Sequence, residues 1–181
     1  MVKKTYFRTV DIALTALFCA LYTVLNVTLG PLSFALLGLP IFHDLGVFFT
    51  LLLVVWITGR FGTSMLAGIV GAILALLISG LYVMIGFVPA VVLFDLLMTA
   101  NHHKIRIKAY SLTVAAIATV LSAYLAGLVI GVFLTVPVQT LYEALTFWGV
   151  WHAIGGVLAI AVTFPVILLL EKANVRKILG D

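Results

Sequence analysis

The sequence contains few charged residues and almost no cysteine. Of its 181 residues, 9% are Asp, Glu, Lys or Arg, whereas 65% are hydrophobic. Soluble domains carry roughly 25% charged residues, so this composition excludes a soluble enzyme, a disordered chain and a nucleic-acid-binding module. The single cysteine, Cys19, excludes an internal disulfide framework. It lies in an apolar stretch, where we interpret it as a small core residue.

The sequence motifs of ATPases and hydrolases are also missing. It contains no GxxxxGK[ST] loop, no HExxH pair and no GxSxG turn. The chain therefore has no ATP-binding motif of its own, and no residue is predicted to be catalytic. No cofactor is expected in this chain.

What the sequence has instead is a series of long apolar stretches separated by short turns. A membrane-crossing helix needs about 20 residues. The stretches predict an all-α integral membrane protein, a single domain over residues 1–181 with six transmembrane helices at approximately 9–29, 42–58, 63–79, 83–100, 109–135 and 141–170. Gly30 and Pro31 are predicted to end the first helix, and residues 32–40 to form a loop or re-entrant cap. Pro89 is expected to kink the fourth helix.

All ten basic residues fall on one side of this six-helix arrangement. They precede the first helix, occupy the turn at Arg60 and the loop after the fourth helix, and follow the sixth helix. The positive-inside rule places that side, with both termini, in the cytoplasm. The predicted location is therefore the cell membrane, with several crossings.

Polar and aromatic residues concentrate on the opposite side. The candidate site residues are Asn26, His43, Asp44, Tyr82, Gln139, Tyr142, Glu143, Thr146, Trp148, Trp151 and His152. An aromatic belt at the membrane interface explains Tyr142, but helical rise puts His152 about 14 Å deeper than Glu143. The other interpretation is an outward-facing pocket for a small molecule. In it, Glu143 suits a cationic or hydrogen-bond-donating group, and stacked rings suit a flat heterocycle or a cation.

Two further groups of ionisable residues have simpler interpretations. His43, Asp44, Glu143 and His152 do not follow a known metal-ligand spacing, so no metal site is predicted. Asp95 lies inside the fourth predicted helix, where charge is costly. It is interpreted as a structural partner of Arg60 or Lys104; the alternative, a proton or ion relay, would need a chain of such groups.

Small residues mark helix surfaces that can approach one another closely. Ala13, Ala16 and Ala20 share one face of the first helix, and Gly127 and Gly131 share a face of the fifth. Gly155 and Ala159 have the same spacing in the sixth helix. Such small-xxx-small patterns favour helix contacts, within the chain or with a partner.

Taken in order, these features resemble the S component of an energy-coupling-factor (ECF) transporter. The resemblance rests on the basic N-terminus, on residues 15–21 (TALFCAL), on Gly30-Pro31, and on Gly59-Arg60-Phe61-Gly62 followed by residues 66–71 (LAGIVG). It covers nearly the whole chain. It implies a six-helix subunit that binds a vitamin in an outward-facing pocket, formed by the last three helices and capped by residues 32–40.

The resemblance also implies partners. The AxxxA motif of that family corresponds here to Ala16 and Ala20, with Ala13 on the same face, and docks on a membrane-embedded coupling subunit. Two separate ATPase subunits then supply the energy. The Trp, Tyr, His and Glu content of the last helices is similar to that of thiamine or pyrimidine binders, and biotin, riboflavin, cobalamin and other vitamin precursors stay open as ligands. Met1-Val2-Lys3 differs from the Met-His start of the nickel and cobalt branch.

Two functions of other classes remain as alternatives. One is a small oligomeric channel or passive carrier that associates through the Gly127 and Gly131 face. The other is a membrane enzyme that uses Glu143 and His152 as acid and base.

Overall fold

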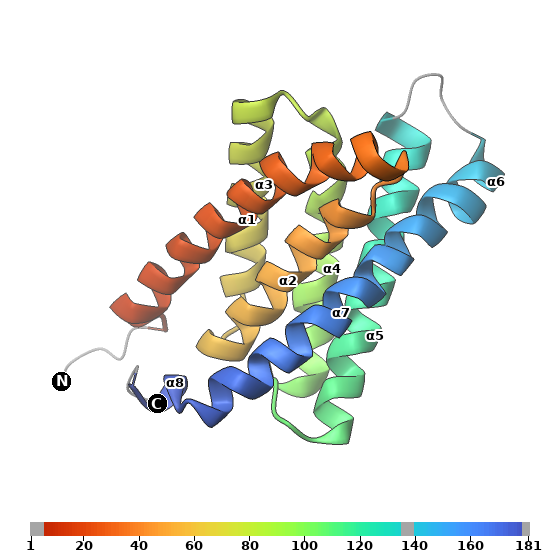
Figure 1. The fold of residues 1–181 in the computed structure, drawn as a ribbon. Helices are drawn as coiled ribbons and strands as arrows, with labels where there is room; N and C mark the ends of the chain where they lie inside the picture. Colours follow the sequence, from red (N-terminus) through yellow and green to blue (C-terminus); the bar gives the residue numbers. More distant parts are fainter. Residues whose placement is uncertain (1–5, 135–139, 179–181) are drawn as a thin grey trace.

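Every regular element is a helix in the computed structural model, which describes residues 6–134 and 140–178 (Figure 1). The α-helices are α1 (Thr9–Leu37), α2 (Ile41–Thr58), α3 (Thr63–Ser79), α4 (Phe87–Leu97), α5 (Ala109–Val129), α6 (Leu141–Glu143), α7 (Gly149–Lys172) and α8 (Val175–Ile178). Two 3₁₀ turns, η1 (Tyr82–Gly86) and η2 (Met98–Asn101), flank α4. Two π-helical turns, η3 (Ile130–Leu134) and η4 (Ala144–Trp148), extend α5 and join α6 to α7.

Five of the described helical segments are long and apolar enough to cross a membrane. They are Thr9–Leu37, Ile41–Thr58, Tyr82–Asn101, Ala109–Leu134 and Leu141–Lys172. The apolar helix α3 is shorter, at 17 residues. The prediction of an all-helical chain is confirmed, and its helices are compatible with a multi-pass membrane protein. The sixth crossing and the cytoplasmic termini stay predictions.

The first helix is longer than predicted. It passes through Gly30 and Pro31 and ends at Leu37, so the predicted loop at 32–40 is wrong for residues 32–37. Gly38 ends it with φ of 66° and donates its N–H to the Phe34 carbonyl at 3.0 Å. Pro31 removes one helical hydrogen bond, whereas an irregular segment in apolar surroundings would leave several backbone groups unpaired. Continuing the helix therefore costs less than breaking it.

The other boundaries lie close to the predicted ones. The bounds of α3 are those predicted, α2 begins one residue earlier, and the last helical segment ends two residues later. Residue 135, the predicted end of the fifth helix, lies outside the described residues. Pro89 is the third residue of α4, after a 3₁₀ turn. It therefore lies in the first turn of α4, where proline is tolerated. A kink of the fourth segment at Pro89 stays a prediction.

Helix α2 lies at the centre of the bundle. It contacts α1, α3 and α7. In its 18-residue apolar stretch, 78% of the residues are buried, against 28% in the corresponding stretches of α1 and of the last helical segment. The flanking helices expose large apolar side chains such as Leu17 and Leu169. Because α2 is central, polar side chains near its start are buried by neighbours on several sides.

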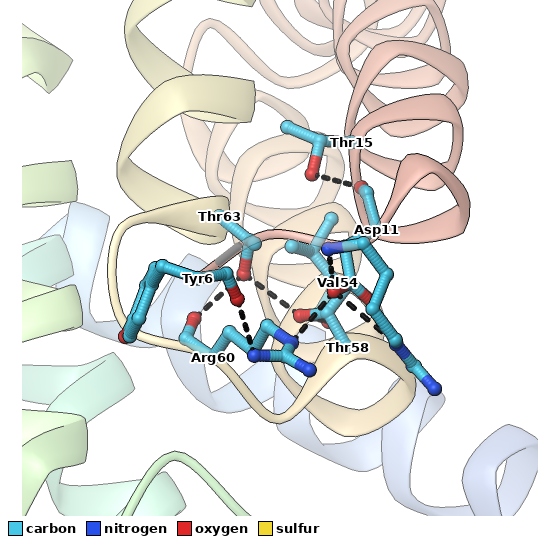
Figure 2. Close-up of polar contacts among 8 residues, drawn as sticks. Tyr6, Asp11, Thr15, Val54, Thr58, Arg60 and Thr63 are labelled. Atoms are coloured by element: carbon cyan, nitrogen blue, oxygen red, sulfur yellow. Dashed lines mark hydrogen bonds and ion pairs between the residues drawn. The ribbon is translucent and has the colours of Figure 1, made fainter. Parts of the chain in front are cut away.

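One end of the bundle is closed by ion pairs around a buried carboxylate. Asp11 at the start of α1 lies 3.0 Å from Arg8 and 2.6 Å from Nε of Arg60, in the turn between α2 and α3. Figure 2 shows that Arg60 also donates to the Tyr6 carbonyl. Nearby, the hydroxyls of Thr58 and Thr63 are 2.7 Å apart. These contacts fix the start of α1 against the turn.

Asp95 has a different partner from either one predicted. Its buried carboxylate accepts hydrogen bonds from the Gly62 N–H (2.9 Å) and the Ser64 hydroxyl, at the start of α3. Its Oδ1 lies 3.9 Å from Nε2 of His103. The predicted pairing with Arg60 or Lys104 is therefore wrong. A carboxylate at a helix N-terminus satisfies otherwise unpaired N–H groups, so Asp95 joins α4 to α3.

Candidate functional site

Four polar side chains are buried together at the end of α2 that is far from Arg60. They are Asn26 from α1, His43 and Asp44 from α2, and His152 from α7, and each is at most 2% exposed. Nδ1 of His152 lies 2.9 Å from Oδ2 of Asp44. Nδ1 of His43 lies 3.4 Å from Oδ1 of Asn26. All four were predicted as site residues, and the three helices bring them together. We refer to them as the polar cluster.

Glycines make room for the polar cluster. A Cβ at Gly155 of α7 would lie 2.8 Å from Oδ2 of Asp44, and a Cβ at Gly30 of α1 would overlap the His43 ring. Any side chain at either position would push the helices apart or displace the polar group. The sequence indicated Gly155 only as part of a small-residue pattern, because the partner of a glycine is not visible in sequence.

Aromatic rings cover the polar cluster on one side. A cavity of about 30 Å³ is lined by Phe34, Pro40, His43, Val83, Phe87, Ile130, Trp148 and His152. The Phe87 and His152 ring centroids are 5.5 Å apart, and those of Trp148 and His152 are 6.3 Å apart. This volume holds one or two water molecules. A ligand of vitamin size would therefore require the surrounding rings to move.

Two buried atoms of the polar cluster lack a hydrogen-bond partner. Across residues 6–134 and 140–178, no donor or acceptor reaches Nε2 of His152 or Oδ1 of Asp44. An unsatisfied buried polar atom costs about 1–3 kcal/mol. His152 lines the cavity, whereas Asp44 does not. An unsatisfied nitrogen beside a cavity is typical of a binding site, since a ligand there can supply the hydrogen bond missing at Nε2 of His152.

Other predicted site residues lie outside the polar cluster. Tyr142, Glu143 and Thr146 are exposed, and Tyr82 is 51% exposed in η1. The Glu143 carboxylate accepts hydrogen bonds from the Thr140 N–H and hydroxyl, both at 2.9 Å, and so caps α6. Gln139 lies outside the described residues.

The π-helical turn η4 affects which side chains near the start of α7 lie next to each other. The Trp148 and His152 rings lie next to each other, and the Trp151 ring contacts Phe147 with centroids 6.5 Å apart. The Glu143 side chain does not take part in these ring contacts, and its carboxylate turns back to accept a hydrogen bond from Thr140. A π turn carries an extra residue and rotates what precedes it relative to the following helix. Residues 141–143 therefore have a different orientation from that of a uniform α-helix.

The small-residue faces have different environments. Ala16 and Ala20 line an open apolar groove of about 450 Å³ between α1 and α3, whose opposite wall includes Leu66 and Val70. Ala13 is exposed but does not line the groove.

The Gly127 and Gly131 face is covered by the chain itself. A Cβ at Gly127 would lie 2.7 Å from the Trp148 carbonyl carbon, and one at Gly131 would lie 2.9 Å from the Ala144 Cβ. This face packs against η4 and the start of α7. It therefore serves the fold rather than contact with a second copy.

Two aromatic residues that line the cavity beside the polar cluster, Phe34 and Phe87, were not predicted as site residues. Phe34 lies in the segment expected to be a loop, and Phe87 was one apolar residue among many. The sequence gives no signal that separates a ring lining a cavity from a ring in the core.

Comparisons of the chain with protein-family models, with curated proteins and with solved structures found no match. The functional assignment therefore depends on the residues and geometry described above.

Proposed function

We propose that this chain is the substrate-binding membrane subunit of an ECF-type importer. It captures a small vitamin-like molecule, with a thiamine-like or pyrimidine-like ring as the first candidate, and delivers it to a coupling subunit served by two ATPases. The observation that carries the proposal is the polar cluster beside the aromatic cavity, with buried His152 and Asp44 atoms that lack partners. The resemblance of the sequence to S components supplies the transport role.

The chemistry of the polar cluster suits a flat, polar heterocycle. Ionisable residues within a membrane-spanning segment are costly and are usually kept for function. Phe87 and Trp148 offer faces for stacking, while Nε2 of His152, which also lines the cavity, offers a hydrogen-bonding position. In the proposed mechanism, Phe34 at the end of α1 moves aside to admit the ligand, since it lines the present small cavity.

The proposed orientation places the polar cluster on the outer side. Basic residues from the segment before α1, the α2–α3 turn, the α4–α5 loop and α8 line one pocket at the other end of the bundle. The positive-inside rule assigns that end to the cytoplasm. A ligand entering near His43 and His152 would then come from outside the cell.

The test is native mass spectrometry of the protein purified gently from cells grown in rich medium. We expect a discrete bound mass that matches a vitamin or its precursor. Trp148→Ala should weaken retention at least about tenfold, equivalent to about 1.4 kcal/mol. Tyr142→Ala is the matched aromatic control, because Tyr142 is 74% exposed. Loss of the bound mass in Tyr142→Ala but not in Trp148→Ala would move the site to the surface of α6 and refute the buried site.

Docking on the coupling subunit makes a separate prediction. Ala16→Trp and Ala20→Trp should fill the groove between α1 and α3 and abolish co-purification with the coupling subunit. The bound small molecule should remain, because the groove lies apart from the polar cluster. Ala161→Trp on the exposed face of α7 is the control. Unchanged co-purification in all three variants would contradict this docking surface.

The two alternative functions lack a supporting observation. Glu143 caps α6 through Thr140, whereas His152 contacts Asp44, so the acid–base pair of the enzyme hypothesis is not assembled. The channel hypothesis used the Gly127 and Gly131 face, which packs within the chain.

A further inference from the structure

A second polar feature, a basic pocket, lies at the Arg60 end of the bundle. It has a volume of about 450 Å³ and is lined by five cationic side chains, with Trp56 among its apolar residues. The cationic residues are Arg8, Arg60, Lys104, Arg106 and Arg176. They come from the segment before α1, the α2–α3 turn, the α4–α5 loop and α8. The fold thus gathers on one concave surface charges that are far apart in the sequence.

The positive charge of the basic pocket is only partly balanced. Asp11 pairs with Arg8 and Arg60, and Glu171 lies 2.7 Å from Arg176. Within the described part of the chain, no carboxylate lies at ion-pair distance from Lys104 or Arg106. Among the described residues, Lys104 and Arg106 therefore contribute positive charge to the basic pocket that no carboxylate pairs with. Like charges held on one surface repel, so a bound anion would be favoured there.

Two arginines of the basic pocket are held in place by other groups of the protein. Arg60 is anchored by the buried Asp11 and by the Tyr6 carbonyl (Figure 2). The Arg176 guanidinium lies 4.9 Å from the centroid of the Trp56 ring and donates to the Ile105 carbonyl at 2.7 Å. An arginine fixed in this way loses little side-chain freedom when it binds a phosphate oxygen.

We propose that the basic pocket binds a phosphate group at the membrane surface, as carried by an anionic phospholipid headgroup. Arginine and lysine recognise phosphate oxygens through charge-assisted hydrogen bonds. The basic pocket lies where apolar helices end, which is the depth of lipid headgroups, and basic pockets between transmembrane helices on the cytoplasmic side bind such groups. The exposed Lys104 and Arg106 form its accessible rim. This site is separate from the proposed transport ligand.

The test titrates the detergent-purified full chain with dioctanoyl phosphatidylglycerol and measures bound lipid by native mass spectrometry. Dioctanoyl phosphatidylcholine, which carries no net charge, is the comparison lipid. We expect Lys104→Gln/Arg106→Gln to weaken phosphatidylglycerol binding about tenfold or more. Lys108→Gln/Lys172→Gln removes two charges at the same end but outside the basic pocket, and should change binding less than about twofold. All four side chains are exposed, so both variants should fold.

The outcomes distinguish binding of the lipid at the basic pocket from a general attraction between the basic protein surface and anionic lipid. If phosphatidylglycerol binding weakens in Lys104→Gln/Arg106→Gln but not in Lys108→Gln/Lys172→Gln, the result supports the basic pocket. Displacement of the lipid by inorganic phosphate at similar concentration also supports it and identifies free phosphate as the source. Equal weakening in both double variants overturns the proposal, because total charge would then explain binding. Equal affinity for the two lipids overturns it as well.

Discussion

Asp44→Ala is expected to lower the free energy of unfolding by about 1–3 kcal/mol, the cost of leaving a buried polar group without its hydrogen-bond partner. Asp44 is fully buried and its Oδ2 lies 2.9 Å from Nδ1 of His152. Without the carboxylate, the His152 ring would be left in an apolar environment with no partner at that nitrogen. His152→Ala should have a similar effect, because it leaves Asp44 unpaired.

The measurement is a double-mutant cycle on the free energy of unfolding in bicelles. Asp44→Ala/His152→Ala removes both polar groups, so its cost should be smaller than the sum of the single costs by about 1–3 kcal/mol. Thr146→Ala, at an exposed position near the start of the same helical segment, should change stability by less than about 0.5 kcal/mol. Additive single effects would show that the two residues do not act as a pair.

The helices and the members of the polar cluster could be predicted from sequence for the same reason. Long apolar stretches mark helices, and within them a polar residue such as Asn26, Asp44 or His152 stands out because its burial is costly. The signal in the sequence is the free-energy cost of burying that polar residue in apolar surroundings. It therefore identifies which side chains need a partner, but not which partner each one finds.

The errors arise where the answer depends on contacts distant in the sequence. Asp95 was assigned a cationic partner, yet it satisfies the N–H and hydroxyl groups at the start of α3 instead. Arg60 pairs with Asp11 rather than Asp95. Charge alone favours any oppositely charged neighbour, whereas the fold decides which one lies within reach.

Local rules also failed at two positions. Gly30 and Pro31 normally end a helix, but here α1 continues to Leu37, and Gly30 provides the space for the His43 ring. The turn η4 breaks the regular helical period after Glu143, so residues 141–143 do not continue the faces of the following helix. Both exceptions lie next to the polar cluster, where the requirements of a site can override local preference.

Gly155→Val is expected to remove the bound molecule and to destabilise the protein by about 1–3 kcal/mol or more, as overpacking of a tight contact does. A Cβ at this position would lie 2.7 Å from Asp44 Cβ and 2.8 Å from the Ile41 carbonyl oxygen. The valine would therefore separate α7 from the start of α2. That movement would pull His152 away from Asp44 and leave both in apolar surroundings.

A neighbouring glycine provides the control that separates packing from function. A Cβ at Gly156 would lie 2.9 Å from the Ala123 Cβ, so Gly156→Ala strains the contact of α7 with α5 and leaves α2 untouched. Gly155→Ala and Gly156→Ala should both lower the unfolding temperature, but native mass spectrometry should show loss of the bound molecule only for Gly155→Ala. If both variants keep it, the close approach of α2 and α7 serves stability alone. If only Gly155→Ala loses the bound molecule, the close approach of α2 and α7 is needed for ligand binding, because the new methyl group contacts α2 in Gly155→Ala and α5 in Gly156→Ala.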